Sequence, residues 1–524
     1  MNNCDKKIKL KKASKYIVSL CIVVLLVAIL FTAYFRALIF MKGTNYYYNG
    51  EIKYIEIEGK DMIDVILLGS SHALNGYNPQ VLWDEYGIAS YNMGTPAQTT
   101  IGSYYMLLEA LTSQTPKLVV MDSFYAYAYA EYRNNQDEEY FVLRNIHTPS
   151  IKKQYVDDVY ERIDWLRKYS KEDLYSDVFY NHDNWKNFDQ FDFLATDSNT
   201  FHKTKGFTYV YNAIWHNAIT PVDFSSCYTD QRLPLVDVYW QYTQKIIDLC
   251  RSKNIDLVFT NLLYGNATTS INARKNTFLD NVTSQGIPFF DSHTQEYYQN
   301  FNWQDNFINV SHLNALGATD ETKRLGQYLA EHYDLPDRRG EFRYRDWDED
   351  FTPSRNNVKD CQVVISSNVK DAVDKVADDP NYVLLGAGCG SYTISQQPSK
   401  DALSTLGVEY PSISSGGRYY LPFSFIYNDG TLYDMTFGQY SHSYTSLNGY
   451  ECTPGTTYEH FTMDDTAREV GGVRISYKYI PAPYTDESIE IKVNSSTLKT
   501  IKSYSQIIVY SKYSNYAIVS YTLY

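Results

Sequence analysis

The sequence predicts an α/β domain with a parallel sheet and three layers, preceded by one transmembrane helix and followed by a β-rich domain. Three observations predict this: short apolar runs alternate with helical patterns, one long segment near the N-terminus lacks charge, and turn-rich β patterns fill the C-terminal part. The chain has 524 residues, which exceeds the size at which a single core stops growing. Two or more domains are therefore expected.

The N-terminal apolar segment predicts a membrane anchor. Residues 16–35 carry no charge, a length that matches the hydrocarbon thickness of a bilayer. Six lysines lie between residues 6 and 15, and positive charge favours the cytoplasmic side. A cleaved signal peptide is the alternative, but its apolar region is normally shorter and ends at a small-residue cleavage site. We expect a single-pass protein of the cell membrane. Its cytoplasmic tail would be residues 1–15, its transmembrane anchor residues 16–40, and its body extracellular.

The main domain, expected over residues 44–333, shows the strand and helix order of a parallel sheet. Asn78 and Pro79 supply an N-cap and a first-turn proline for one of its helices. The carboxyl ends of parallel strands meet at one sheet edge, where open α/β sheets bind ligands. The expected strands are 64–72, 89–94, 117–123, 255–261 and 287–290, and the expected helices are 79–87, 98–111, 235–251, 270–284 and 314–333.

Two segments break or follow this pattern. Residues 125–233 are an insertion that leaves the carboxyl end of a strand, so they form either a cap over a site or a helical subdomain with an aromatic core. Residues 334–357 are charged and lack a regular apolar period, which predicts a linker. The aromatic residues of the insertion include Tyr125, Tyr127, Tyr129, Trp165, Tyr169, Trp185 and Trp215.

Residues 358–524 predict a β-rich accessory domain, either α+β or a sandwich. Short β patterns alternate with Gly, Pro, Asn and Asp turns, and one helix is expected near 399–406. The expected strands are 362–367, 381–388, 419–427, 472–480, 488–493 and 505–511.

Composition argues against several functional classes. The chain has 47 basic and 61 acidic residues and a net charge of -14, which disfavours a nucleic-acid binder. Its seven cysteines are far apart and lack zinc-site spacing, so we expect no metal site and no cofactor. Tyrosine is frequent, with 52 residues, which suits sugar-binding surfaces but is also common in exported β-rich proteins.

A serine nucleophile and its partners can be assigned along the main domain. Ser71 lies in a Gly-Ser-Ser-His turn after the first strand, where small residues let its side chain project from the sheet edge. Such a nucleophile needs an imidazole to take its proton and N–H donors for the oxyanion. His312, just before the last helix, is the candidate base. The backbone N–H groups of Ser71 and Gly94 are the candidate oxyanion donors.

These residues resemble the SGNH (GDSL-like) hydrolase superfamily over roughly residues 63–333, especially its membrane-anchored branch that modifies cell-surface polymers. The nucleophile block is similar to residues 69–71, the oxyanion-glycine block to residues 92–94, and the family's Asp-x-x-His block to residues 309–312. The resemblance implies an O-acetyl esterase or O-acyltransferase that acts on a cell-surface polysaccharide. Transfer would also require a membrane protein that delivers acyl groups.

Two departures from the family pattern leave activity open. The family's Gly-x-Asn-Asp block is absent, and Asp122 and Ser123 occupy its place. The carboxylate of the triad is replaced by Asn309, and in the serine-protease example an Asp-to-Asn change costs about 10⁴ in kcat because the imidazole takes the wrong tautomer. Three explanations compete: Asp305 supplies the carboxylate, a backbone carbonyl orients His312 in a dyad, or the domain is inactive and binds glycan.

Three further features complete the sequence interpretation. Residues 382–408 resemble the interleukin-like (ILEI) domain, in which a strand is followed by a helix ending in Leu-Gly, and this implies a carbohydrate-binding or interaction role. His72 is expected in the first turn of a helix. Residues 291–293 (Asp-Ser-His) form a second carboxylate and imidazole pair, interpreted as a polar loop or as an alternative base.

Overall fold

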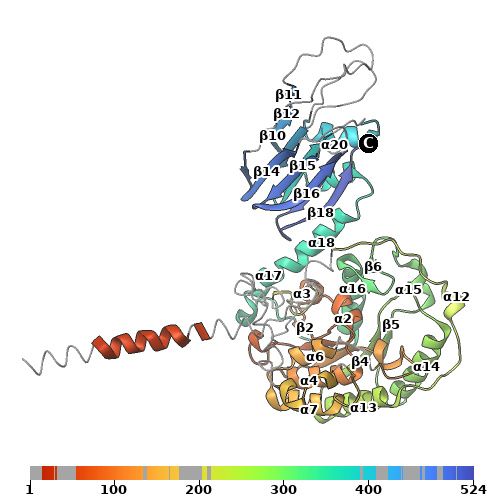
Figure 1. Ribbon diagram of the computed structural model, residues 1–524. Coiled ribbons are helices and arrows are strands. Elements are labelled where there is room, and N and C mark those ends of the chain that lie inside the picture. The colour runs from red at the N-terminus through yellow and green to blue at the C-terminus, as the bar shows by residue number, and fades with distance from the viewer. Residues whose placement is uncertain are drawn as a thin grey trace, which may run out of the picture. The chain divides into compact units, whose positions relative to one another are not determined.

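The computed structural model (Figure 1) divides into two compact units. Unit 1 comprises residues 1–212, 219–313 and 317–352, and unit 2 comprises residues 213–218, 314–316 and 353–524. The structure describes residues 15–28, 30–31, 55–133, 139–164, 166–175, 203–208, 214–389, 394–408, 423–437, 439–440, 461–462, 466–480, 488–502 and 504–524.

The N-terminal part is described as helix at residues 15–28 and 30–31. Over the parts of the chain that the structure describes, no helix combines the length and the apolar character that crossing a bilayer requires.

Unit 1 is built on a five-stranded sheet whose strands are all parallel, which confirms the predicted α/β class. The strands lie in the order β2-β1-β3-β4-β5. β1, β2 and β3 are buried along their whole length, and β1 is apolar throughout, as expected for strands covered by helices on both faces. The strands are β1 (Val65–Leu68), β2 (Ser90–Asn92), β3 (Leu118–Asp122), β4 (Asp256–Asn261) and β5 (Phe289–Asp291).

Helices cover both faces of this sheet and make three layers. Ile66 and Leu68 of β1 belong to an apolar cluster that includes residues of α4 (Thr100–Ala110), α13 (Asp237–Ser252) and α14 (Thr269–Thr283). Val65 and Leu67 belong to the cluster on the other face, with residues of α3 (Pro79–Tyr86) and α16 (Ala315–His332). The alternation follows from the period of two along a strand, and all five expected helices are confirmed.

The described part of the insertion packs largely onto the first of these clusters. Tyr155, Val156 and Val159 are buried there, so aromatic and apolar residues of this segment act as core. Tyr125 and Tyr127 are also buried, whereas Trp165 and Trp185 lie outside the described residues. The helical elements of this segment are α5 (Phe124–Tyr127), α6 (Glu139–Asn145), α7 (Pro149–Val159), η2 (Leu166–Lys168), α8 (Lys171–Leu174) and α12 (Phe224–Cys227).

One buried cation ties the insertion to two other segments of unit 1. The Lys205 side chain is fully buried, and its Nζ lies 2.9 Å from Glu58 and 2.7 Å from Asp350. Its Nζ also lies 4.6 Å from the centre of the Trp347 ring. The Lys205 carbonyl accepts a hydrogen bond of 2.8 Å from the N–H of Asn92 at the end of β2. Because an unpaired buried charge is costly, these contacts fix the position of the segment beside β2.

The prediction that residues 334–357 form a linker is wrong for its first part. Residues up to Thr352 belong to unit 1 and contribute to its core. Tyr344, Trp347 and Phe351 are buried, and the rings of Trp347 and Trp83 lie 5.0 Å apart. Their spacing of three and four residues is a helical apolar stripe that the surrounding charges obscure. The elements here are η4 (Phe342–Tyr344), α17 (Trp347–Asp350) and α18 (Thr352–Val364), and α18 contains the expected domain boundary at 358.

In its described residues, unit 2 contains two larger antiparallel sheets and a short antiparallel pair of β11 (Gln439–Tyr440) and β12 (Phe461–Thr462). The first sheet has the order β10-β9-β8-β17-β18, and the second has the order β13-β14-β15-β16. One face of the first sheet packs with α19 (Val369–Val376) and α20 (Gln397–Thr405), and its other face packs with the second sheet. The strands are β8 (Tyr382–Gly388), β9 (Phe423–Asn428), β10 (Thr431–Phe437), β13 (Arg468–Val470), β14 (Val473–Ile480), β15 (Ser488–Val493), β16 (Ser496–Lys502), β17 (Ser505–Ser511) and β18 (Tyr516–Thr522).

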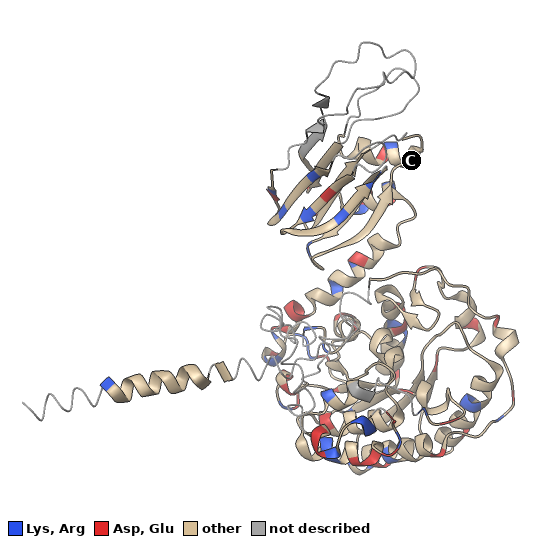
Figure 2. Cartoon of the chain, in the orientation of Figure 1, with Lys and Arg blue, Asp and Glu red and all other residues tan. Residues whose placement is uncertain are grey.

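The strand expected at 362–367 is wrong, because residues up to Val364 continue helix α18. Cys361 and Val363 are buried, so packing overrides the β propensity of this valine-rich segment. The helix expected near 399–406 is confirmed as α20. Figure 2 shows acidic and basic residues interspersed along the described elements of each unit.

Candidate active site

Ser71 stands at the first position of a short helix that follows β1, the strand between β2 and β3 in the sheet. β1 ends at Leu68, and α2 (Ser71–Gly76) begins after only two residues. Gly69 makes this turn with φ of 142°, and a Cβ there would lie 2.7 Å from the Cβ of Asp122. Ser70 is the N-cap, since its Oγ accepts a 3.3 Å hydrogen bond from the N–H of His72. The capping task thus falls to Ser70 and leaves the hydroxyl of Ser71 for other contacts.

A tight β-hairpin presents Asn309 and His312 together. Its strands are β6 (Phe307–Asn309) and β7 (His312–Leu313), and Asn309 is paired with His312 across the turn. The N–H of Gly265, in the loop after β4, donates a 2.7 Å hydrogen bond to the carbonyl of Val310 in this turn. The hairpin is therefore anchored at the carboxyl edge of the sheet, where Ser71 lies.

The structure brings Ser71, His312 and Asn309 into one hydrogen-bonded row. The Oγ of Ser71 lies 2.8 Å from Nε2 of His312, and Nδ1 of His312 lies 3.0 Å from Oδ1 of Asn309. The same Oδ1 accepts a 2.9 Å hydrogen bond from the N–H of Ser311. Because that N–H pairs only with an oxygen, the amide oxygen faces the imidazole and Nδ1 carries the proton. Nε2 is then free to accept the proton of Ser71.

Asp305 does not lie in this row. Its carboxylate accepts a 2.9 Å hydrogen bond from the side-chain amide of Asn302. Among the described residues, the polar partners of the His312 ring are Ser71 and Asn309. The expectation that Asp305 supplies a carboxylate is therefore wrong, and so is the expectation that a backbone carbonyl orients the imidazole. The side-chain amide of Asn309 does so instead.

The imidazole of His312 is held in its neutral form. Burial lowers its pKa from the usual range to about 4. The ring of His72 lies edge-on to it, with 5.7 Å between the ring centres. The pKa of His72 is also well below its usual value, because of its burial first and then of the neighbouring His312 and His293. A neutral His312 at neutral pH is the form that a general base requires.

The two predicted oxyanion donors, the N–H groups of Ser71 and Gly94, differ in whether they already have a hydrogen-bond acceptor within the local structure. The N–H of Ser71 lies in the first turn of α2, where no intrahelical acceptor exists. The N–H of Gly94, expected to face the crevice, instead donates a 2.9 Å hydrogen bond to Oδ1 of Asn92. The Asn92 amide also donates to the carbonyls of Ala73 and Tyr77, so it ties the loop after β2 to α2.

Asp122 and Ser123, which occupy the place of the Gly-x-Asn-Asp block, supply no donor to the row of Ser71, His312 and Asn309. Asp122 ends β3 and is buried, and burial raises the pKa of its carboxyl to about 7. The hydroxyl of Ser123 donates a 2.7 Å hydrogen bond to the carbonyl of Thr260.

The second carboxylate and imidazole pair lies after β5. The carboxylate of Asp291 accepts from Lys275 at 2.7 Å and from the N–H of His293 at 2.8 Å. The Nε2 of His293 accepts a 3.1 Å hydrogen bond from the N–H of Tyr264. His293 is thus committed to the backbone and does not serve Ser71 as an alternative base.

One feature of the site had a signal in the sequence that the expectations missed. An asparagine side chain commonly accepts a hydrogen bond from the N–H two residues further on. Asn309 and Ser311 have this spacing, and the bond between them is what turns the amide oxygen toward His312.

Comparison with known proteins identifies no family by sequence. No protein-family model and no curated protein matches the chain. Solved structures that match include a candidate lipolytic protein of the G-D-S-L family from Desulfitobacterium hafniense, with a TM-score of 0.26, 11% identity, and coverage of 50% of this chain and 97% of that chain. A candidate acylhydrolase from Bacteroides fragilis matches with a TM-score of 0.25, 10% identity, and coverage of 51% of this chain and 86% of that chain.

Proposed function

We propose that the chain carries out acyl-ester chemistry, as an O-acetyl esterase or an O-acyltransferase, with Ser71 as nucleophile. The observation that carries the proposal is the 2.8 Å contact between Oγ of Ser71 and Nε2 of His312. His312 is the proposed general base, and Asn309 is a positioning residue that acts through His312.

The proposed reaction has two steps. Oγ of Ser71 attacks the ester carbonyl carbon while its proton passes to Nε2 of His312. The tetrahedral intermediate collapses, the bond to the leaving alcohol breaks, and that alcohol takes the proton back from His312. Water or the hydroxyl of an acceptor then attacks the acyl-Ser71 ester with the same base, which yields hydrolysis or transfer.

The proposed oxyanion donors are the N–H groups of Ser71 and Gly94. The position of Ser71 in the first turn of α2, where its N–H has no intrahelical acceptor, supports this proposed role. Gly94 can contribute only when its N–H exchanges Oδ1 of Asn92 for the substrate oxygen, since the two are hydrogen-bonded at 2.9 Å.

The substrate in this proposal is a cell-surface polysaccharide, and the body of the chain is extracytoplasmic. The uncharged residues 16–35 and the lysines before them support an N-terminal membrane anchor. Transfer, unlike hydrolysis, would need a membrane partner that delivers acyl groups outside the cell. A carbohydrate-binding or interaction role for unit 2 belongs to the same proposal and rests on the resemblance of residues 382–408 to the ILEI domain.

A non-catalytic, glycan-binding or assembly protein that keeps the fold is the second candidate function. Two observations favour it: an amide rather than a carboxylate faces His312, and Gly94 already has an acceptor for its N–H.

A chromogenic acetyl ester separates the two functions. The full-length protein in detergent is compared with Ser71→Ala, and we expect the variant to lose about 10³-fold or more of the rate. Asp305→Asn is the matched control, because Asp305 lies outside the row, and its rate should stay near that of the wild type. Equal rates for the wild type and Ser71→Ala would overturn the enzymatic proposal and favour the binding protein.

A further inference from the structure

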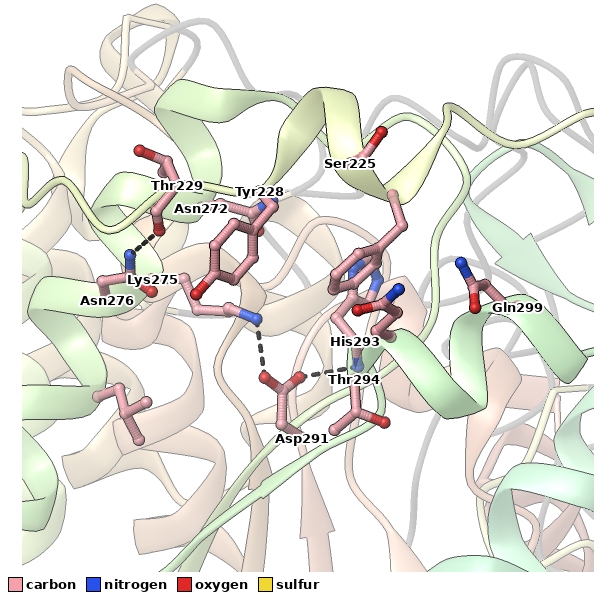
Figure 3. Close-up of a pocket in the computed structure, with 13 residues that line it drawn as sticks. Ser225, Tyr228, Thr229, Asn272, Lys275, Asn276, Asp291, His293, Thr294 and Gln299 are labelled. Carbon is pink, nitrogen blue, oxygen red and sulfur yellow. Dashed lines mark hydrogen bonds and ion pairs between the residues drawn. The ribbon is translucent and has the colours of Figure 1, made fainter.

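A second concave site lies at the same edge of the sheet, beyond β5. It is a pocket of about 500 Å³. Its walls come from α12, from α14, from the loop after β5 and from α15 (Gln295–Asn300) (Figure 3). The volume is in the range of small-molecule sites. The row of Ser71, His312 and Asn309 does not contribute to its lining.

Most of the residues that line this pocket are polar, and they present both carbon atoms and polar atoms to it. Of the 13 lining residues, Phe224, Tyr228 and Leu279 are apolar or aromatic, and the others carry a hydroxyl, an amide, an imidazole or a charge. An acyl chain would prefer an apolar wall, so the lining favours a ligand rich in hydroxyl groups.

The charged groups of the lining neutralise each other. Nζ of Lys275 lies 2.7 Å from Oδ2 of Asp291, and both side chains are largely buried. Figure 3 shows this ion pair, together with the hydrogen bond from the N–H of His293 to Asp291. An anionic ligand would have to compete with Asp291 for Lys275, so the pocket is suited to an uncharged ligand.

Two further features of the lining fit a sugar. Tyr228 lines the pocket and the residue is 60% exposed, and an exposed tyrosine ring offers an apolar face for stacking on a sugar ring. Asn272 lines the pocket and is buried, and its Oδ1 has no hydrogen-bond partner, although its Nδ2 donates to the carbonyl of Cys227 at 2.7 Å. A hydroxyl group of a bound ligand would satisfy that acceptor.

A series of contacting rings lies along the sheet edge between Ser71 and the pocket. The ring centres of His72 and Phe124 are 4.1 Å apart, those of Phe124 and Tyr264 are 5.0 Å apart, and those of Tyr264 and His293 are 4.2 Å apart. Ser71 follows β1 and the pocket begins after β5, with β3 and β4 between them. Three strand spacings of about 4.8 Å separate them by roughly 14 Å, which exceeds the size of a single sugar unit.

We propose that this pocket is a distal subsite that binds an uncharged saccharide unit of the polymer whose ester group is presented to Ser71. The link to Ser71 rests on the proposed function, whereas saccharide binding by the pocket does not. An extended substrate would occupy both sites at once, and a small ester would occupy only the site at Ser71.

Binding is tested on the full-length protein with chitotriose as the neutral probe and with glucuronate and inorganic phosphate as anionic probes. We expect chitotriose to bind and Tyr228→Ala to weaken its Kd at least about fivefold. Tyr433→Ala is the matched control, because Tyr433 is a similarly exposed tyrosine of unit 2. Asn272→Leu is a second pocket variant and should also weaken binding. Equal affinity of Tyr228→Ala and the wild type, binding of the anionic probes alone, or no binding of chitotriose would overturn the pocket's assignment.

Kinetics separate this proposal from the proposed function. With O-acetylated chitotriose as the ester substrate, Tyr228→Ala should raise KM at least about fivefold and leave kcat unchanged. The same variant should turn over a small acetyl ester at the wild-type rate. If the small ester is not turned over by the wild type but chitotriose still binds in a Tyr228-dependent way, the enzymatic function fails and the saccharide site stands. If the small ester is turned over through Ser71 and chitotriose does not bind, the distal subsite fails alone.

Discussion

Oδ1 of Asn309 lies 3.0 Å from Nδ1 of His312, across the turn of a β-hairpin, in the place where a catalytic triad has a carboxylate. The N–H of Ser311 holds the amide oxygen in that direction. A triad carboxylate both orients the imidazole and stabilises the imidazolium by its charge. In this chain Asn309 performs the first task and cannot perform the second.

The pH profile of ester turnover should reflect a neutral, buried base. Burial lowers the pKa of His312 to about 4, and the base works only when it is deprotonated. The rate should therefore stay constant as the pH falls from about 7 and should decline only as the pH approaches about 4. Measurement of kcat/KM between about pH 3 and pH 7 checks this. A decline centred near the ordinary histidine value of about 6.5 would contradict a base whose pKa is lowered by burial.

Asn309→Asp should increase activity. The carboxylate keeps the acceptor for the N–H groups of Ser311 and His312 and adds a negative charge that stabilises the imidazolium. We expect kcat to rise by roughly tenfold to a hundredfold, and the acidic limb of the profile to move up by about 1 to 3 pH units.

Asn309→Leu is the companion variant, because it removes both the acceptor and the charge at similar size. Its kcat should fall at least about a hundredfold as His312 loses its fixed tautomer. The idea that Asn309 orients the base would be refuted by a kcat for Asn309→Leu that equals that of the wild type.

Gly69→Ala should destabilise unit 1 and misplace Ser71. The residue has φ of 142°, and its Cβ would lie 2.7 Å from Cβ of Asp122 and 2.9 Å from Cβ of Ala73. We expect a loss of about 3 kcal/mol or more, seen as a lower melting temperature, together with a loss of ester turnover. Gly286→Ala is the control, since Gly286 also has positive φ but has no neighbour near the new Cβ, and it should cost only about 1 kcal/mol. Similar melting temperatures for the two variants would argue against the close approach at Gly69.

Ser70→Ala should affect stability far more than chemistry. The Oγ of Ser70 caps α2 through the N–H of His72, whereas the Oγ of Ser71 contacts His312. Loss of an N-cap costs about 1 kcal/mol, which for a unit of this size lowers the melting temperature by about 1 to 2 °C. Ester turnover should stay within about tenfold of the wild type, in contrast to Ser71→Ala. An inactive but stable Ser70→Ala protein would mean that the roles of the two serines are reversed.

Local patterns in the sequence were sufficient to predict the parallel sheet. The apolar run Val65–Leu68 and the glycine at position 69 predict a buried strand and a tight turn, because each follows from local sterics and burial. Likewise, Asn78 and Pro79 predict the start of α3. The linker at 334–357 was mispredicted because the apolar stripe of Tyr344, Trp347 and Phe351 lies among charged residues, and only packing against Trp83 makes it core.

The sequence by itself determined the order of the elements and the candidates Ser71 and His312, since backbone turns and apolar periods are local properties. The tertiary structure alone decided what surrounds them, because residues 241 positions apart meet only when the sheet forms. In the structure, the carboxylate of Asp305 bonds to Asn302 and not to His312, and the N–H of Gly94 bonds to Oδ1 of Asn92. The side chain of Asn309 bonds to His312 across the turn of a hairpin. The bond between Asn309 and Ser311 follows a local spacing, whereas the contact between His312 and Ser71 depends on side-chain directions that only the folded sheet determines.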